Sequence, residues 1–377
     1  MTPQVEAPGP TPVRVPDGAA GVALIKPGVR ALPAYTLEHP PARRKLNQNE
    51  SPYDFPDALK REVADRIAAL PWHRYPEFAP ASLVALLARH YGWVPDGVLI
   101  GNGSNELIQA TLAVTLREGD AIVAPAPTFS LYRLLAGVFG ARYHAVSLGL
   151  DFAYDVDRIV AVAVQERARV VVLNSPNNPT GSALPEGAVE RLLAETDALL
   201  LCDEAYQDFG GPSAMPLLHE NPRVVVLRTF SKALGMAGLR FGLGLAHPAV
   251  AREIAKAKLP YNVNVATLAA AEVALAHADV VAMQVKRLVE TRSAAIARIR
   301  RIPGLHVYDS AGNFFLVRFL MIPARDVFQR LYEDHGILVR DLSGVADLAG
   351  CLRISVGMPA DMDAVAAALE SIMKERA

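Results

Sequence analysis

The sequence predicts an α/β protein whose large domain is built on a mostly parallel central sheet covered by helices on both faces. From Val98 onward, short β-branched runs alternate with stretches of helical spacing, and 51% of the 377 residues are hydrophobic, enough to bury a large core. Such alternation is typical of parallel strands joined by helices. Ligands of these folds bind beyond the carboxyl ends of the strands, so the residues that follow each strand are the candidates for a site.

Each element of the large domain follows from a local pattern. The predicted strands are 98–101, 121–124, 170–173, 198–202, 224–227 and 241–245. The predicted helices are 106–116, 131–139, 186–195 and 249–258. Residues 266 to about 300 predict one or two long helices that lead out of this domain. A smaller α+β domain follows, with strands 306–307, 314–319, 337–341 and 352–356, and helices 324–335 and 360–374.

Composition limits the possible partners. The net charge is −1, from 38 basic and 39 acidic residues, so no charge field exists to attract nucleic acid or an anionic membrane. Cys202 and Cys351 have neither disulfide-framework nor metal-ligand spacing, which suits a reducing compartment and predicts no metal site.

The first 30 residues lack a basic start followed by an apolar block, and no apolar stretch is long enough to span a membrane. We therefore expect a cytoplasmic protein.

The most informative stretch is 228–242, which carries Lys232 just beyond a predicted strand. Its neighbours include Ser231, two glycines and a second cation, Arg240. Lys232 is either a surface charge or a tuned nucleophile. Burial and a nearby positive charge would both favour the neutral amine, which Schiff-base chemistry with an aldehyde requires.

Polar residues follow three other strands. Gly103, Ser104 and Asn105 open a predicted helix, and this turn is either a simple cap or a phosphate cradle. Asn178, held by Pro179, is either part of a plain turn or a rigid amide donor at the mouth of a site.

Asp203 ends a predicted apolar strand, so its carboxylate should meet a cation. The cation is either a protein side chain in a structural salt bridge or a protonated pyridine nitrogen. In the second case, Tyr206 could reach the phenolic oxygen of the same ring.

Taken in order, these motifs resemble the pyridoxal-phosphate-dependent aminotransferases of the aspartate-aminotransferase fold type (fold type I), and among them the histidinol-phosphate aminotransferases. The resemblance runs from about Pro33 to the C-terminus. Its motifs are 46–53 (Leu-Asn-Gln-Asn-Glu-Ser-Pro-Tyr), 74–76 (Arg-Tyr-Pro), 101–107, 127–132, 174–181, 203–206, 228–242, 260–264, 336–341 and 352–357.

The resemblance implies a role for each candidate residue in binding pyridoxal 5′-phosphate. Lys232 would form the covalent imine with the cofactor and, once released, shuttle the proton. Asp203 would keep the pyridine nitrogen protonated, and Asn178 and Tyr206 would bond the phenolic oxygen. The cofactor phosphate would be bound by Gly103, Ser104, Asn105, Ser231 and Arg240. Phe129 stands where relatives commonly have a tyrosine stacked on the ring, and it can still stack.

The resemblance also implies substrates and a partner. Arg353 would bind the glutamate carboxylate and also the phosphate of the other substrate, and Asn178 would contribute to the same substrate site. Arg340 and Tyr35 would contact the phosphate-bearing substrate. Tyr75 would reach the cofactor phosphate of the partner subunit in a homodimer. The implied organisation is a mobile tail over 1–32, an arm over 33–75 that contributes to the small domain and the dimer, a large domain over 76–280 and a small domain over 281–377.

The resemblance implies a transaminase of histidine biosynthesis that moves an amino group between L-histidinol phosphate and 2-oxoglutarate. An aromatic-amino-acid aminotransferase and a threonine-phosphate decarboxylase of the same fold are the alternatives, because the motifs do not separate these substrates. A regulatory or binding protein without catalysis is a more remote one. This last alternative is disfavoured because the sequence contains all four implied cofactor-binding residues, Lys232, Asp203, Asn178 and Arg240.

Overall fold

The computed structural model describes residues 17–34 and 40–375. The chain forms two units, Met1–Leu37 and Glu38–Ala377. In the first unit, where the sequence predicted a mobile tail, the described residues contain two short helices, α1 (Ala19–Ala23) and α2 (Pro27–Arg30). Tyr35 lies outside the described residues, so its contact with the substrate stays a prediction.

The second unit contains a seven-stranded sheet. Its strands are β2 (Val98–Asn102), β3 (Ala121–Ala126), β4 (Arg142–Ser147), β5 (Val170–Asn174), β6 (Leu199–Asp203), β7 (Val224–Thr229) and β8 (Phe241–Ala246). They lie in the order β2-β8-β7-β6-β5-β3-β4. Only β8 runs antiparallel to its neighbours, and the remaining pairs are parallel. The predicted mostly parallel sheet is therefore confirmed.

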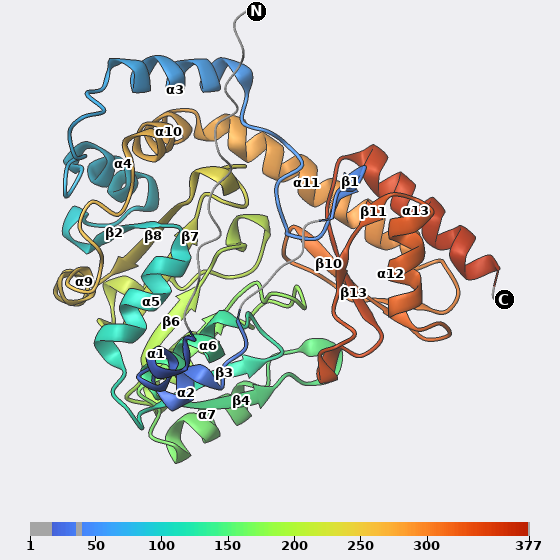
Figure 1. The fold of residues 1–377 in the computed structure, drawn as a ribbon, viewed down its shortest axis with the longest axis horizontal. Helices are drawn as coiled ribbons and strands as arrows, with labels where there is room; N and C mark the ends of the chain where they lie inside the picture. Colours follow the sequence, from blue (N-terminus) through green and yellow to red (C-terminus); the bar gives the residue numbers. More distant parts are fainter. Residues whose placement is uncertain (1–16, 35–39, 376–377) are drawn as a thin grey trace, which may run out of the picture. The chain divides into compact units, whose positions relative to one another are not determined.

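Helices cover both faces of this sheet (Figure 1). They are α3 (Asp57–Ala69), α4 (Ala81–Tyr91), α5 (Ser104–Thr115), α6 (Leu131–Phe139), α7 (Val156–Gln165), α8 (Ala188–Glu195), α9 (Pro248–Ala255) and α10 (Val265–Ala276). Residues of α3, α4, α7, α8 and α10 share one core cluster, and those of α5, α6 and α9 share the other. Short 3₁₀ helices lie between these elements, at η1 (Pro95–Gly97), η2 (Leu150–Phe152), η3 (Gln207–Phe209), η4 (Met215–His219) and η5 (Ala237–Leu239).

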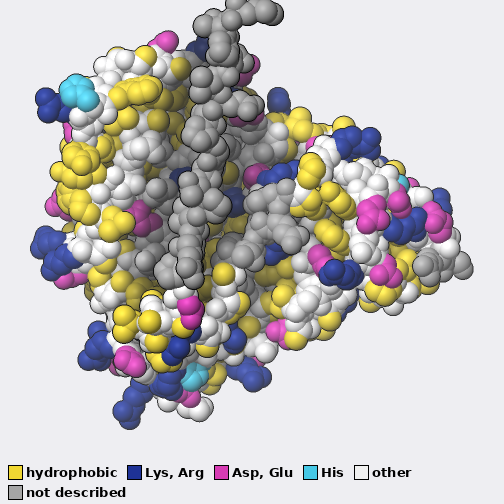
Figure 2. All heavy atoms as spheres, in the orientation of Figure 1, with side chains coloured by type: hydrophobic (Ala, Val, Ile, Leu, Met, Phe, Trp, Pro, Cys, Tyr) yellow, Lys and Arg dark blue, Asp and Glu magenta, His cyan; other side chains and the backbone are white. Residues whose placement is uncertain are grey.

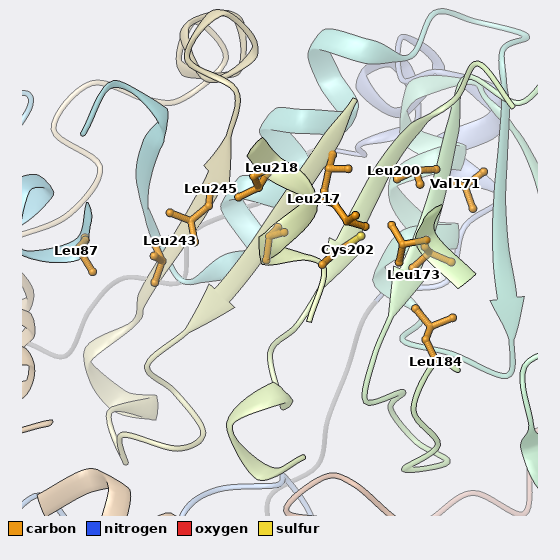
Figure 3. Packing of buried hydrophobic residues seen from close by; sticks show 14 of the residues in the cluster. Leu87, Val171, Leu173, Leu184, Leu200, Cys202, Leu217, Leu218, Leu243 and Leu245 are labelled. Atoms are coloured by element: carbon orange, nitrogen blue, oxygen red, sulfur yellow. The ribbon is translucent and has the colours of Figure 1, made fainter. Parts of the chain in front are cut away.

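The period of two along each buried strand explains how one sheet serves two cores. Alternate residues of a strand point to opposite faces. In β6, Leu200 and Cys202 therefore belong to the first cluster while Leu201 belongs to the second. Figure 3 shows Leu200 and Cys202 together with Leu217 and Leu218 of η4, which pack over the same face. Continuous apolar runs in the sequence therefore mark strands that are buried on both sides.

The C-terminal part of the second unit has its own core. Its elements are α11 (Ala278–Ile299), β9 (Leu305–Val307), β10 (Phe314–Phe319), α12 (Ala324–Glu333), β11 (Ile337–Leu338), β12 (Arg340–Asp341), η6 (Ala346–Leu348), β13 (Cys351–Ser355) and α13 (Pro359–Lys374). Strands β12-β13-β10-β9 form an antiparallel sheet. A separate short strand, β1 (Arg44–Lys45), pairs in parallel with β11. The segment near residue 44 is therefore part of this C-terminal structure.

Several elements differ from the sequence expectations. The predicted strand 337–341 is two strands, because β11 pairs with β1 while β12 pairs with β13. Strand β4 was not predicted, since it is an edge strand with only Val146 buried and thus lacks an apolar run. Helices α3, α4 and α7 were also missed. The predicted domain boundaries stay predictions.

The described residues contain no single helix that is long and apolar enough to cross a membrane. Helices α10 and α11, which meet at 79°, reach the required length and apolar composition only when they are taken together as a bent pair. On the described part of the face drawn in Figure 2, basic and acidic side chains are interspersed.

Candidate active site

Lys232 lies in the loop between β7 and β8, where its side chain is half-buried. Its Nζ donates a hydrogen bond to the carbonyl oxygen of Gln48 at 3.0 Å and lies 5.7 Å from the centre of the Tyr206 ring. Burial, followed by the positive charge of Arg353 and then that of Arg240, lowers the pKa of Lys232 to about 7. Much of the amine is therefore neutral near neutral pH, which favours a nucleophile over a surface charge.

The start of α5 forms a cradle with Arg240. The N-cap residue is Gly103, at φ 76°, and a Cβ built there would lie 2.6 Å from Nη2 of Arg240. A Cβ at Gly242 would lie 2.2 Å from the amide nitrogen of Ser104. Glycine is therefore required at both positions for the backbone and the guanidinium to approach this closely.

Arg240 also links the cradle to the lysine loop. Its Nη1 donates to Ser231 Oγ at 3.1 Å and to the Ala237 carbonyl at 3.0 Å. Asn105 is exposed in the first turn of α5. A helix N-terminus, a hydroxyl and a fixed guanidinium thus converge, which is the arrangement that binds a phosphate.

Asp203 ends β6 and is almost fully buried. Its Oδ2 accepts from the Tyr132 hydroxyl at 2.6 Å and its Oδ1 from the Ala205 amide at 3.2 Å. Burial raises the pKa of Asp203, and the hydrogen bond from Tyr132 opposes the rise. Among the residues that the structure describes, no lysine or arginine forms an ion pair with Asp203.

The protein cation expected beside Asp203 is instead paired with the next residue, Glu204. Arg228 Nη2 lies 2.7 Å from Glu204 Oε2, and both side chains are buried. In the described part of the chain, the structural salt bridge that the sequence allowed for Asp203 does not form, and the buried Arg228 pairs with the neighbouring Glu204. Asp203 stays available for a cation that arrives with a ligand.

Asn178 and Arg353 meet on the other side of the site. Arg353 Nη1 donates to Asn178 Oδ1 at 2.5 Å, and Nη2 donates to the carbonyl of Asn47 at 2.7 Å. The backbone of Asn178 is fixed by its N–H bond to Asn174 Oδ1 at 2.9 Å. Two directed hydrogen bonds therefore set the plane of the Arg353 guanidinium, as recognition of a carboxylate requires.

The segment 47–49 joins these groups. Its carbonyls accept from Arg353, Lys232 and Asn313, one residue after another. The side chain of Asn49 donates from Nδ2 to the Tyr206 hydroxyl at 3.1 Å. This connection from the N-terminal arm to the lysine was not predicted.

The remaining candidate residues differ in their burial and in the side chains next to them. Phe129 is half-buried and edge-on to Tyr132, with ring centres 5.7 Å apart. Arg340 is half-buried on β12, opposite Arg353 on β13. Tyr75 is 81% exposed and stacks on Tyr261, with ring centres 4.6 Å apart. Tyr75 thus belongs to a surface and not to the centre of this site.

The sequence interpretation missed two side chains of the site. Tyr132 and Asn49 both lie in motifs that supported the resemblance, but neither was given a role. Tyr132 follows Phe129 by three residues. Because Tyr132 is fully buried, its hydroxyl needs a hydrogen-bond acceptor inside the protein. That requirement was the available signal for Tyr132. No local signal marks Asn49, because its partners are Tyr206 and Ser355.

Comparison with known proteins defines the class of this fold and site. The family model of aminotransferase class I and II matches residues 44–369. The match covers most of the chain, so the chain belongs to this family of aminotransferases.

Individual relatives narrow the likeness. The histidinol-phosphate aminotransferase of Prosthecochloris aestuarii is 37% identical over 342 residues, which cover 90% of this chain and 95% of the relative. That of Thermococcus gammatolerans is 38% identical over 349 residues, with 93% and 97% covered. The crystal structure of histidinol-phosphate aminotransferase from Sinorhizobium meliloti in complex with pyridoxal-5′-phosphate is similar, with a TM-score of 0.83, 27% identity, and coverage of 94% of this chain and 99% of that one.

Proposed function

We propose that this aminotransferase uses pyridoxal 5′-phosphate to move an amino group between L-histidinol phosphate and 2-oxoglutarate, giving imidazole-acetol phosphate and glutamate, in histidine biosynthesis. One observation carries the substrate assignment. Arg340 and Arg353 lie opposite each other at the site, in a chain whose relatives at 37% and 38% identity are named histidinol-phosphate aminotransferases. Two guanidinium groups suit a substrate phosphate in one half-reaction and a carboxylate in the other.

The residues present fit the cofactor at three points. The cradle of Gly103, Ser104, Ser231 and Arg240 suits its phosphate, with Asn105 in the first turn of the same helix. Asp203, which is buried beside no protein cation in the described chain, suits a protonated ring nitrogen. Lys232, with a pKa near 7, suits the aldehyde. Bound pyridoxal phosphate supplies an electron-withdrawing ring that stabilises negative charge on the substrate carbon.

The protein residues position the reactants and move the proton. Lys232 Nζ is the base that removes the proton from the substrate carbon bearing the amino group, since its lowered pKa matches neutral pH. Asp203 holds the ring-nitrogen proton, and Tyr132 orients that carboxylate through its hydroxyl. Asn178 and Tyr206 would hold the ring oxygen of the cofactor, and Phe129 would stack on its ring.

The substrate is bound on the side of the small domain. Arg353, which is fixed by Asn178 and the Asn47 carbonyl, binds the glutamate carboxylate. Arg340 lies directly across the strand pair and contacts the phosphate of histidinol phosphate.

A homodimer completes the proposed assembly. Tyr75, Phe78 and Tyr261 form an exposed aromatic cluster, with Tyr75 stacked on Tyr261 and Phe78 edge-on to Tyr261 at 5.9 Å between ring centres. Trp72 and Leu259, close to this cluster in the sequence, are exposed as well. An exposed aromatic cluster of this kind is typical of a protein interface. In the dimer, Tyr75 reaches the cofactor phosphate of the other subunit. The cytoplasmic location stays a prediction from the sequence.

The test is an absorbance spectrum of the purified holoenzyme, followed by half-reactions with single amino donors. L-histidinol phosphate and L-glutamate should each bleach the visible cofactor band, and L-phenylalanine and L-threonine phosphate should react far more slowly. Lys232→Ala should abolish the response, whereas Lys256→Ala, which removes an exposed lysine paired with Glu253, should not.

Each other outcome has a distinct meaning. Faster reaction with phenylalanine would make the chain an aromatic aminotransferase. Carbon dioxide release from threonine phosphate would make it a decarboxylase. Protein that stays colourless after addition of pyridoxal phosphate would remove the catalytic proposal.

A further inference from the structure

One buried side chain, that of Asn174, joins two of the residues that are proposed to bind the cofactor ring. Asn174 is the last residue of β5 and is 2% exposed. Its Nδ2 donates to the main-chain carbonyl of Asp203 at 3.1 Å, and its Oδ1 accepts from the main-chain N–H of Asn178 at 2.9 Å. The residue proposed for the ring nitrogen and a residue proposed for the ring oxygen are therefore linked through a single amide.

The two partners of Asn174 fix the direction in which its amide faces. A carbonyl oxygen only accepts and a main-chain N–H only donates, so Nδ2 must face Asp203 and Oδ1 must face Asn178. The reverse orientation would bring two acceptors together at Asp203 and two donors together at Asn178. Both partners are satisfied only by a short side chain that carries a donor and an acceptor, as an asparagine amide does.

The sheet places Asn174 beside Asp203, and the Asn174 side chain extends this order to the next turn. Strands β5 and β6 are parallel, and their last residues, Asn174 and Asp203, are register partners. The main-chain N–H of Ser175 also donates to the Asp203 carbonyl, at 3.0 Å. Asn178 lies beyond the end of β5, so the strand pairing does not reach it. The Asn174 amide therefore connects the Asn178 turn to the sheet.

The position of Asn178 in turn affects two side-chain contacts. Because a guanidinium only donates, the oxygen of the Asn178 amide accepts from Arg353 Nη1, at 2.5 Å. The Nδ2 of Asn178 is then the end of the amide that would donate to the ring oxygen of the cofactor. A displacement of the Asn178 backbone would thus alter the hydrogen bond to the cofactor and the support of Arg353 together.

We propose that Asn174 is a positioning residue that fixes Asn178 relative to Asp203, so that the ring oxygen and the ring nitrogen of the cofactor are bound at the same time. The proposal rests on the proposed use of pyridoxal phosphate. In this role Asn174 acts through Asp203 and Asn178. A hydrogen bond donated to the ring oxygen favours its ionised form, so correct placement of Asn178 lowers the pKa of the proton that this oxygen shares with the lysine–cofactor nitrogen.

The test is a pH titration of the visible absorption of the holoenzyme. Asn174→Ala removes both hydrogen bonds and should raise the apparent pKa of the cofactor band by roughly half a unit to one unit. Cofactor release during dialysis should become about 5- to 10-fold faster, because Asp203 is also held less firmly. Asn174→Ser should shift both quantities in the same direction by less. Circular dichroism will show which variants are folded, and Asn174→Ser carries the test if Asn174→Ala does not fold.

Tyr154→Phe is the matched control. The hydroxyl of the buried Tyr154 donates to the main-chain carbonyl of Asn174, so this variant removes a hydrogen bond at the same residue and leaves the Asn174 side chain unchanged. Tyr154→Phe should lower the unfolding temperature and leave the apparent pKa of the cofactor band unchanged. If Asn174 served only the stability of the fold, the Asn174 variants and Tyr154→Phe would affect the titration alike.

The same titration in an Asn178→Ala background shows whether the effect passes through Asn178. There, the shift caused by Asn174→Ala should fall by roughly half or more, because only the contribution through Asp203 is left. The faster release of the cofactor should persist, since the bond to the Asp203 carbonyl is lost in either background.

The outcomes that would overturn the proposal differ from those that test the function. An unchanged titration in folded Asn174→Ala and Asn174→Ser would overturn it. A full shift in the Asn178→Ala background, or an equal shift in Tyr154→Phe, would also overturn it. A wild-type protein that binds no pyridoxal phosphate would instead remove the proposed function on which this proposal rests. A wild-type cofactor band that bleaches with the proposed donors leaves the function intact whatever the variants do.

Discussion

Arg340 and Arg353 lie directly opposite each other on the antiparallel strands β12 and β13. Like charges in this arrangement repel, so the pair is unfavourable unless an anion lies nearby. In the described part of the chain, no carboxylate lies within ion-pair distance of Arg340. The proposed binding of a phosphate or carboxylate beside this pair would therefore reduce the repulsion at Arg340.

We expect Arg340→Gln to separate the two substrates. Loss of a charge-assisted hydrogen bond should raise the KM for histidinol phosphate by about 10- to 100-fold, and the glutamate half-reaction should change by less than about 3-fold. Stopped-flow spectra with each donor will measure both. Arg325→Gln serves as the matched control. It removes an exposed arginine whose Nη1 lies 3.7 Å from Oδ2 of Asp341, the residue that follows Arg340 in β12. Equal losses with both donors would contradict the assignment of Arg340.

The lowered pKa of Lys232 predicts how cofactor capture depends on pH. The amine is protonated and unreactive below its pKa of about 7 and neutral above it. The rate at which cofactor-free protein takes up pyridoxal phosphate should therefore rise between about pH 6 and pH 8 and then level off. Rapid-mixing absorbance will record this profile. A rate that continues to rise toward pH 10 would show an ordinary lysine.

Arg228→Leu should strongly destabilise the protein. The change leaves the Glu204 carboxylate buried without its cation, and such losses lower the free energy of unfolding by about 3 to 5 kcal/mol. Burial already raises the pKa of Glu204, and loss of Arg228 raises it further. Protonation relieves the unpaired charge, so the destabilisation should be larger at pH 8 than at pH 6.

Urea unfolding of the holoenzyme will measure this effect. The double variant Arg228→Leu/Glu204→Gln should recover most of the lost stability, because the buried Glu204 charge is then removed together with its cation. A pH-independent loss, or no recovery in the double variant, would show that packing of the arginine and not its charge is responsible.

Phe78→Asp should weaken the proposed dimer. Phe78 is 69% exposed and lies edge-on to Tyr261, so the change should disturb an interface more than the fold of one subunit. Sedimentation should show a larger monomer fraction, and dialysis should remove the cofactor faster because Tyr75 is lost from the neighbouring site. Leu150→Asp, at an exposed leucine in η2, is the control. A dimer unaffected by Phe78→Asp would place the interface elsewhere.

The sequence predicted those parts of the site that follow directly from a strand end. Asp203 and Lys232 come after apolar runs, and parallel strands bring such ends to one edge of the sheet. Contacts between distant segments were not predictable in this way. Asn49 meets Ser355 across 306 residues, and the partner of Asp203 proved to be a hydroxyl on α6 and not a protein cation. Strand β4 was missed because a half-exposed edge strand carries little apolar pattern.

The pairing of β1 with β11 has a consequence for how the protein folds. β1 leads directly into the segment that accepts hydrogen bonds from Lys232 and Arg353, and the bond from Arg353 to Asn47 spans 306 residues. Contacts that close such long loops form late, because the chain entropy between them must be lost first. During synthesis, residues 44–49 must wait until β11 and β13 have been made. Residues 44–49 are therefore made long before the strands with which they complete the proposed catalytic centre.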